Sequence, residues 1–311
     1  MRILFILPES LNDTILLAPC LEGVIKTKNK SSIVLLGNKN SLSIYKNNSK
    51  IRTTITTKDS YFQAIKQALN LGKFDISIDF ENSFKSKLFL KFLKSNLKIS
   101  FKDKPKEQIH KTQIYKMFLQ KCFDTEIKLS KYNLYQEKIK SSTPTIGFNL
   151  GLQLDSRNWN IDEFYSLVLK MSSFYKIALF GHNDLTSDLS ARLKSKNIKN
   201  YEDYSNKNIN TQIKIISSLE ALISTDDWAS QVASAYNIPS IIIYGSSNIA
   251  QTSPYLHNNT ILLSKNLYCS PCNKSKCPIK SHDCMQQIRA KDIYNAYTKL
   301  KTNFEITIQK V

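Results

Sequence analysis

The sequence predicts an α/β protein of two doubly wound halves, each a parallel sheet with helices on both faces. Short runs rich in Ile, Leu and Val alternate with longer stretches of helical periodicity. At 311 residues the chain is longer than one ordinary domain. The alternation also restarts after a polar segment at residues 138–143, which Pro144 follows. We therefore expect an N-terminal domain at 1–143 and a C-terminal domain at 144–311.

The first half reads as strand and helix in turn. Its three expected strands are each five residues long, and each is followed by a polar segment and then a helical pattern. In chain order the expected elements are a strand at 3–7, a helix from about 14, a strand at 32–36, a helix at 61–71, a strand at 76–80, a helix at 85–94 and a lysine-rich helix at about 106–122.

The second half repeats the pattern. Its last helix is stopped by Pro239, which cannot continue a helix. The expected elements are a strand at 145–149, a helix at 161–173, a strand at 176–180, a helix at 185–195, a strand at 221–224, a helix at 228–237 and a strand at 240–244. In such sheets ligands bind beyond the carboxyl ends of the strands, so the polar residues there are the candidates for function.

The charge of the chain points to an anionic partner. Lys and Arg number 44 against 25 Asp and Glu, and residues 1–150 hold 26 of the basic and 12 of the acidic side chains. Nucleic acid, an anionic membrane surface and a phosphorylated substrate all fit this bias. The apolar run after Met1 ends at Pro8 without a cleavage site, and no run is long enough to span a bilayer. We expect a cytoplasmic protein.

A carboxylate in the segment after the first strand is a candidate for function. Asp13 stands three residues after Ser10, at the expected start of a helix. It can cap that helix by accepting backbone N–H bonds. Alternatively it lies at a cleft mouth as a general base, where the helix dipole favours its anion.

Two segments follow strands of the second half. Arg157 stands two residues before Trp159, so the Arg can hold a phosphate while the Trp packs the loop, or it can be a surface residue beside an anchor. The segment 225–231 begins the next helix, whose amides would point at a diphosphate. The simpler alternative is that Asp226 or Asp227 only caps this helix.

Four cysteines lie close together near the end of the chain. A Cys-x-x-Cys turn with two further thiols can close a tetrahedral site for zinc or iron, although reduced thiols without a metal fit equally well. The four are Cys269, Cys272, Cys277 and Cys284. The histidines have no helical pair spacing, so we expect no catalytic metal.

Taken in order, these segments resemble glycosyltransferase family 9, the ADP-heptose:lipopolysaccharide heptosyltransferases. The family opens with Met-[Arg/Lys]-[Ile/Val]-Leu and has Gly-Asp before a helix, and here residues 1–4 lead to Asn12 and Asp13. Its Tyr-Asp-x-x-Ile-Asp strand corresponds to 74–79, followed by Lys-Ser at 85–86. Its Lys-x-Trp-Pro-x-x-x-Phe loop corresponds to 157–164, with Arg157 in place of Lys and Asn160 in place of Pro.

A further family motif, Thr-Asp-Ser/Thr-Gly-x-x-His-x-Ala, corresponds to residues 225–233. Here Trp228 replaces the Gly and Gln231 replaces the His, so a hydrogen-bond donor remains but no proton carrier. The cysteine tail, ending in Cys-Met-x-x-Ile at 284–288, resembles the type of family member that adds the second heptose.

The resemblance implies a GT-B fold, in which two Rossmann-like domains face a cleft with the acceptor on the N-terminal side. It implies an inverting transfer of heptose from ADP-heptose to a lipopolysaccharide inner-core acceptor, with Asp13 as base and no catalytic cofactor. The implied donor-binding residues are Gly151, Leu152, Gln153, Arg157, Asp184, Asp226, Asp227, Trp228 and Gln231.

The implied acceptor is a lipid, so we expect the protein to act peripherally on the cytoplasmic face of the inner membrane. Lysines on or near one helix would bind the anionic surface while Leu88, Phe89 and Phe92 enter it, unless they form only a solvated face. These lysines are Lys87, Lys91, Lys94 and Lys98. Other interpretations are a degenerate family member, suggested by Trp228, and a transferase for another nucleotide sugar. A nucleic-acid binder is disfavoured, since basic and aromatic residues do not interleave.

Overall fold

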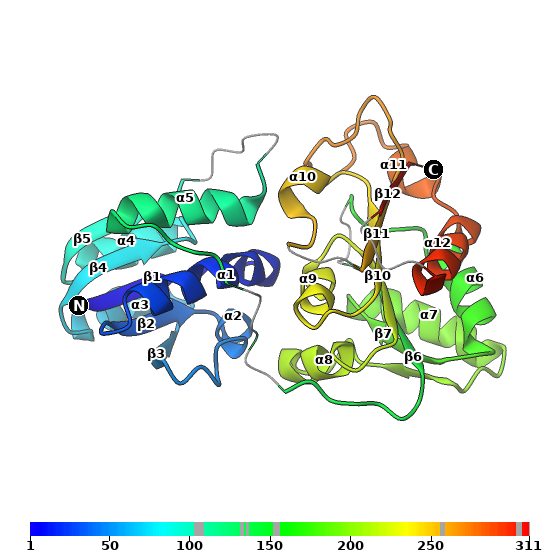
Figure 1. Ribbon diagram of the computed structural model, residues 1–311, viewed down its shortest axis with the longest axis horizontal. Coiled ribbons are helices and arrows are strands. Elements are labelled where there is room, and N and C mark those ends of the chain that lie inside the picture. The colour runs from blue at the N-terminus through cyan, green and yellow to red at the C-terminus, as the bar shows by residue number, and fades with distance from the viewer. Residues whose placement is uncertain are drawn as a thin grey trace. The chain divides into compact units, whose positions relative to one another are not determined.

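The computed structural model of the protein describes residues 1–102, 109–130, 134, 137–151, 156–255, 259–302 and 307–310. Its chain divides into two compact units, Met1–Gln136 and Glu137–Val311. Figure 1 shows the first unit in blue to green and the second in green to red. The division lies seven residues before the boundary expected from the polar segment at 138–143.

The first unit contains a five-stranded parallel sheet in the order β3-β2-β1-β4-β5. Apolar Ile, Leu and Val fill its inner strands, as expected for a sheet buried on both faces. The elements are β1 Arg2–Ile6, α1 Leu11–Thr27, β2 Ser32–Gly37, α2 Lys39–Ser43, β3 Ile51–Thr56, α3 Tyr61–Asn70, β4 Phe74–Asp79, α4 Phe84–Phe92, β5 Ser95–Ser100 and α5 Lys111–Phe123.

Helices cover both faces of this first sheet. On one face α3 and α4 lie side by side, and Ala68 and Phe89 pack against Leu4 and Ile6 of β1. On the other face α1 packs along α5, and Phe5 of β1 contacts the ring of Phe123 at a centroid distance of 6.4 Å. Because the strands are parallel, α1, α3 and α4 all begin at the carboxyl edge of the sheet.

The second unit contains a seven-stranded parallel sheet in the order β12-β11-β10-β9-β6-β7-β8. Its central strands are almost wholly buried. The elements are β6 Thr145–Asn149, α6 Ile161–Ser172, β7 Lys176–Phe180, α7 Asn183–Ser195, β8 Tyr201–Asp203, α8 Ile209–Ile216, β9 Ala221–Thr225, α9 Trp228–Ala235, β10 Ser240–Tyr244, α10 Ile249–Thr252, β11 Thr260–Ser264, α11 Asp283–Gln286, α12 Ala290–Thr302 and β12 Thr307–Lys310.

The main core of the second unit lies on one face of its sheet. There α6, α7 and α12 pack on alternate strand residues such as Ile146, Phe148, Ile223 and Ile243. The helices α8 and α9 pack against each other, and α9 also packs on β9 and β10. Turns at the carboxyl ends of β6, β9 and β10 therefore lie at one edge, where α9 and α10 begin.

Several elements differ from the expectation. The lysine-rich helix begins at Lys111 rather than near 106, and residues 103–108 lie outside the described part. The helix expected to reach residue 237 ends at Ala235, and Asn237 adopts a left-handed φ of 55°. The sequence did not reveal the strands β3, β5, β8, β11 and β12. No helix in the described ranges is both long and apolar enough to cross a bilayer.

Candidate functional site

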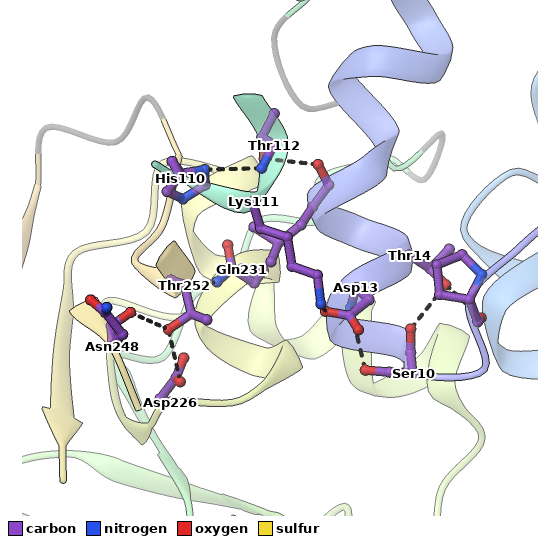
Figure 2. Close-up of polar contacts among 12 residues, drawn as sticks. Ser10, Asp13, Thr14, His110, Lys111, Thr112, Asp226, Gln231, Asn248 and Thr252 are labelled. Atoms are coloured by element: carbon purple, nitrogen blue, oxygen red, sulfur yellow. Dashed lines mark hydrogen bonds and ion pairs between the residues drawn. The ribbon is translucent and has the colours of Figure 1, made fainter. Parts of the chain in front are cut away.

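Asp13 lies in the first turn of α1, directly after β1. The cap of this helix is Ser10, whose Oγ accepts a hydrogen bond from the Asp13 backbone N–H at 3.3 Å. The Asp13 carboxylate instead pairs with Lys111, with 2.9 Å between Nζ and Oδ1, as Figure 2 shows. Because Ser10 caps the helix, the Asp13 carboxylate is not needed as a cap. It lies at the carboxyl edge of the sheet, and 26% of its side chain is exposed to solvent.

The start of α5 holds Lys111 beside Asp13. The Thr112 hydroxyl donates to the Leu16 carbonyl of α1 at 2.8 Å, and the buried thiol of Cys20 donates to the Thr112 carbonyl at 3.2 Å. His110 caps α5 by accepting the Thr112 N–H on Nδ1 at 3.2 Å. These bonds fix the helix end that carries Lys111. Sequence reasoning missed this residue, because it is one lysine among many in its stretch and its partner belongs to another helix.

The turn between β9 and α9 buries two adjacent carboxyl groups. Asp227 accepts the Trp228 backbone N–H on Oδ1 at 2.6 Å, so it caps α9. Asp226 accepts the Thr252 hydroxyl on Oδ2 at 3.0 Å, a contact visible in Figure 2. The Ser230 N–H bonds the Asp227 carbonyl at 3.0 Å. The backbone N–H groups of Trp228 and Ser230, in the first turn of α9, therefore already donate hydrogen bonds within the protein. Fewer N–H groups of this turn are left to bind an anion.

Burial changes the acidity of both carboxyl groups. It raises the pKa of Asp227 to about 6 and also raises the pKa of Asp226, while the nearby Arg157 guanidinium acts to lower both pKa values. Arg157 donates from Nη1 to the Asp226 carbonyl at 3.4 Å. The structure thus brings Arg157 to the turn that the sequence singled out. The negative charge of this turn falls as the pH falls through about 6.

Gly151 follows β6 in a conformation and a space that favour glycine. Its φ is +82°, and a Cβ there would lie 2.6 Å from Asn158 Oδ1 and 2.7 Å from Thr225 Oγ1. The backbone of this loop therefore passes directly beside the end of β9. Leu152 and Gln153, also expected at the donor, lie outside the described residues.

Three buried oxygen atoms beside this loop lack a hydrogen-bond partner within the described part of the chain. They are Asn149 Oδ1, Thr225 Oγ1 and Asp226 Oδ1, on side chains at most 2% exposed. Asn149 does use its Nδ2, which donates to Ser224 Oγ at 3.0 Å. Buried polar atoms are nearly always satisfied in folded proteins, so these atoms mark a place where a polar ligand or water would bind.

The remaining candidates of the second unit have different surroundings. Trp228 is half-buried as the first residue of α9. Gln231 is fully buried, and its Nε2 donates to the Thr252 carbonyl at 2.8 Å, so it joins α9 to α10. Asp184 is exposed in the first turn of α7, with 3.7 Å between its Oδ2 and His182 Nδ1.

Trp159 anchors the loop that carries Arg157. Its indole N–H donates to the Ile288 carbonyl at 2.7 Å, and its ring meets Phe164 edge-on at 4.7 Å. Only 4% of Trp159 is exposed. The loop is thus held to both α6 and the segment that follows the cysteines.

The six cysteines all lie in the described part and are all free thiols. The thiols of Cys269, Cys272 and Cys277 raise the pKa of Cys284, to which burial contributes most, to about 11. They are therefore close enough to interact electrostatically. However, within the described ranges no three His, Cys, Asp or Glu side chains are grouped tightly enough to hold a metal ion. The thiol set suits zinc or iron chemically, but this arrangement is not a formed ligand shell.

The lysines expected at a membrane, Lys87, Lys91, Lys94 and Lys98, are all exposed. The expectation for the apolar residues between them is partly wrong. Phe89 is only 2% exposed because it faces the sheet, whereas Phe92 is 38% exposed.

A protein-family model, glycosyltransferase family 9 (heptosyltransferase), matches residues 117–282, more than half of the chain. The chain belongs to glycosyltransferase family 9. It is 27% identical to a lipooligosaccharide heptosyltransferase 2 of Campylobacter jejuni subsp. jejuni, over 97% of this chain and 100% of that protein.

Solved structures of family 9 share the fold of this chain. A family 9 glycosyl transferase from Veillonella parvula aligns with a TM-score of 0.80 at 19% identity, covering 96% of each chain. The ADP-heptose lipopolysaccharide heptosyltransferase II of E. coli aligns with a TM-score of 0.73 at 16% identity, over 96% of this chain and 98% of that one. The two parallel-sheet units are thus those of the GT-B fold, as the motifs had implied.

Proposed function

We propose that this family 9 protein transfers a heptose from ADP-heptose to a hydroxyl of a lipopolysaccharide inner-core acceptor, with inversion at the anomeric carbon. The similarity to a lipooligosaccharide heptosyltransferase over nearly the whole of both chains supports the substrate class. The observation that carries the chemistry is the carboxylate of Asp13, left at the sheet edge by the Ser10 cap and paired with Lys111.

On the acceptor side, Asp13 takes the proton of the attacking hydroxyl as its oxygen bonds to the anomeric carbon. The bond from that carbon to the diphosphate breaks at the same time, through an oxocarbenium-like state, and ADP leaves with the bonding electrons. Lys111 holds the carboxylate in one orientation through a 2.9 Å contact. It is a positioning residue in this scheme, because it acts through Asp13.

On the donor side, the β9–α9 turn and the Gly151 loop bind the nucleotide. Arg157 supplies the positive charge that stabilises the leaving diphosphate, with no divalent cation. The unpartnered oxygens of Asn149 and Asp226 accept hydrogen bonds from sugar hydroxyls, and the Thr225 hydroxyl can donate to a phosphate oxygen. Burial raises the pKa of both Asp226 and Asp227, so their negative charge, and with it their repulsion of the diphosphate, decreases as the pH falls.

The direct test is an assay of ADP release and product formation with a panel of nucleotide sugars and truncated lipopolysaccharide acceptors. Turnover with ADP-heptose above that with ADP-glucose or UDP-sugars supports the proposal. Arg157→Ala should raise the donor KM or lower kcat by roughly tenfold or more, whereas Arg157→Lys should retain most activity because the charge remains. Turnover with another nucleotide sugar alone would refute the heptose assignment.

Trp228 favours one second candidate, a family member that binds the donor poorly. Its half-buried indole stands at the first position of α9, where the family has glycine. A shift of the melting temperature with ADP-heptose would separate the two functions. No shift at millimolar donor, together with no turnover, would favour the degenerate form, and Trp228→Gly would then be expected to restore binding.

For the cysteine loop we infer a structural zinc or iron site that forms only when the thiols draw together. The support is that four free thiols lie within sixteen residues of one another in the chain, Cys269 to Cys284, and that thiols are suitable ligands for zinc and iron. Metal analysis of the purified protein, compared with a Cys269→Ser, Cys277→Ser variant, tests it. A metal content below one tenth of an equivalent in both proteins would refute the site.

We further propose that the protein works at the cytoplasmic face of the inner membrane as a peripheral protein. The support is the lipid nature of the proposed acceptor and the exposed lysines Lys87, Lys91, Lys94 and Lys98. Cell fractionation at low and high salt tests this location. Recovery in the soluble fraction under both conditions would contradict it.

A further inference from the structure

Three large aromatic side chains are exposed at the ends of two neighbouring helices. Tyr61 is 54%, Phe62 75% and Phe84 71% exposed. Tyr61 and Phe84 are the first residues of α3 and α4, and their rings meet edge-on at a centroid distance of 5.7 Å. Exposed aromatics gathered in this way are unusual on a soluble surface and mark a contact site. We call Tyr61, Phe62 and Phe84 the aromatic tip.

The two helices behind the aromatic tip are basic. Neither α3 nor α4 contains an Asp or a Glu. Their lysines are Lys66, Lys85, Lys87 and Lys91, and Lys94 follows α4. Acidic residues precede each helix at Asp59 and Glu81, and the Glu81 carboxylate is engaged by the Ser83 hydroxyl at 2.6 Å. The surface therefore combines protruding aromatic rings with an excess of positive charge.

The aromatic tip also has a defined place in the fold. Since β1, β3 and β4 are parallel, α1, α3 and α4 all start at the carboxyl edge of the first sheet. Asp13 lies in the first turn of α1 at this same edge. Near the C-terminal ends of α3 and α4, Leu69 and Phe92 are 53% and 38% exposed. Both helices therefore expose an apolar side chain at each end.

We propose that the aromatic tip is a membrane-docking surface whose rings enter the headgroup region of an anionic bilayer while the lysines of α3 and α4 bind lipid phosphates. Aromatic side chains favour the membrane interface, and each lysine near an anionic surface adds attraction. This inference rests on the proposed function, in which the acceptor is a lipid. Docking here would bring the edge that carries Asp13 to that lipid.

The test is co-sedimentation of the full chain with phosphatidylcholine vesicles, made with and without phosphatidylglycerol. The Phe62→Ser, Phe84→Ser variant should bind the anionic vesicles roughly tenfold more weakly or worse. Phe174→Ser is the matched control, because Phe174 is 73% exposed but belongs to the second unit, and it should bind as the wild type does. Equal binding by wild type and the double variant would overturn the proposal.

The lysines are tested in the same assay. Replacing Lys66, Lys87 and Lys91 with Gln should weaken binding by about fivefold for each lysine, and binding should fall as salt rises. The same replacement at the exposed Lys194, Lys196 and Lys199 of the second unit is the control and should have little effect. Equal binding to vesicles with and without phosphatidylglycerol would overturn the choice of an anionic surface.

Kinetics with a soluble, deacylated acceptor separate this inference from the proposed function. The Phe62→Ser, Phe84→Ser variant should keep the wild-type kcat and KM there. A raised KM would mean that the tip binds the acceptor saccharide and would overturn membrane docking. Membrane docking would also be overturned if the wild type forms a dimer in analytical ultracentrifugation and this variant is a monomer. If the wild type transfers no heptose, the proposed function is wrong. The comparison of wild type and variant in vesicle binding would still show whether the aromatic tip docks on a membrane.

Discussion

Ser10 and Asp13 at the start of α1 lie beside Lys111, the first residue of α5. Ser10 caps α1, and the Asp13 carboxylate pairs with Lys111. In the proposed reaction Lys111 orients this carboxylate and Asp13 is the general base. The alternative that Asp13 serves as the cap is thereby removed, because its carboxylate has another partner.

We expect Asp13→Ala to lower kcat by roughly 10²- to 10⁴-fold, the range that a general base contributes. Lys111→Met should lower kcat less, since the base remains but loses its orienting partner. Lys121→Met, on the exposed side of the same helix, is the control. Because a partly exposed ion pair contributes at most about 1 kcal/mol, all three variants should unfold at nearly wild-type urea concentrations. An Asp13→Ala rate within tenfold of wild type would exclude the general base.

The buried carboxyl of Asp227 makes stability depend on pH in a defined direction. Its pKa is raised to about 6 in the folded protein, above its unfolded value of 3.8. The stabilisation from this group is complete below pH about 4 and is lost as the pH rises through about 6. Relative to Asp227→Asn, the wild type should therefore lose up to about 3 kcal/mol of unfolding free energy between pH about 4 and 7. Urea unfolding of both proteins at each pH measures this, and a constant difference would contradict the buried ionisation.

Among the elements, the loop before α6 depends on one side chain. Trp159 fills the core and bonds the Ile288 carbonyl. Trp159→Phe should reduce the unfolding free energy by about 1 to 3 kcal/mol, since a buried carbonyl loses its donor. The half-buried Trp228 provides the comparison, and Trp228→Phe should have a smaller effect. The chain has two Trp residues, so fluorescence of the remaining one reports unfolding in each variant. Equal losses would contradict the anchoring role.

The strands that sequence patterns revealed are the buried ones. Residues 145–149 and 240–244 are buried along their whole length, and their apolar side chains are Ile146, Phe148 and residues 241–244. The edge strands β3 and β5 were missed, because Thr, Lys and Asn face solvent there and break the apolar run. The motifs led to Asp13, Arg157 and the β9–α9 turn as candidate site residues. They could not reveal Lys111 or Thr252, which come near their partners only when separate helices pack.

At the scale of the whole chain, the uneven distribution of charge predicts different salt dependences for the proposed acceptor and donor. Residues 1–150 carry 26 basic and 12 acidic side chains. An acceptor bearing phosphates and acidic sugars should therefore be attracted over a distance, and salt should weaken this attraction. We expect the KM of a soluble acceptor to rise severalfold between about 50 and 500 mM NaCl, and the KM of the donor to rise less. Equal salt dependence of the two constants would contradict a specialised basic half.

The strand order of the two sheets has a consequence for how the chain is made. In each sheet the strand synthesised first is an inner one, β1 in the first and β6 in the second, and later strands add outward on either side. The ribosome therefore synthesises an inner strand before the strands that flank it. Each later strand can pair with the edge of a sheet that is already partly formed. All elements of the first sheet precede residue 101. That sheet can assemble while the second unit is still being translated, which shortens the time that its apolar strands spend exposed.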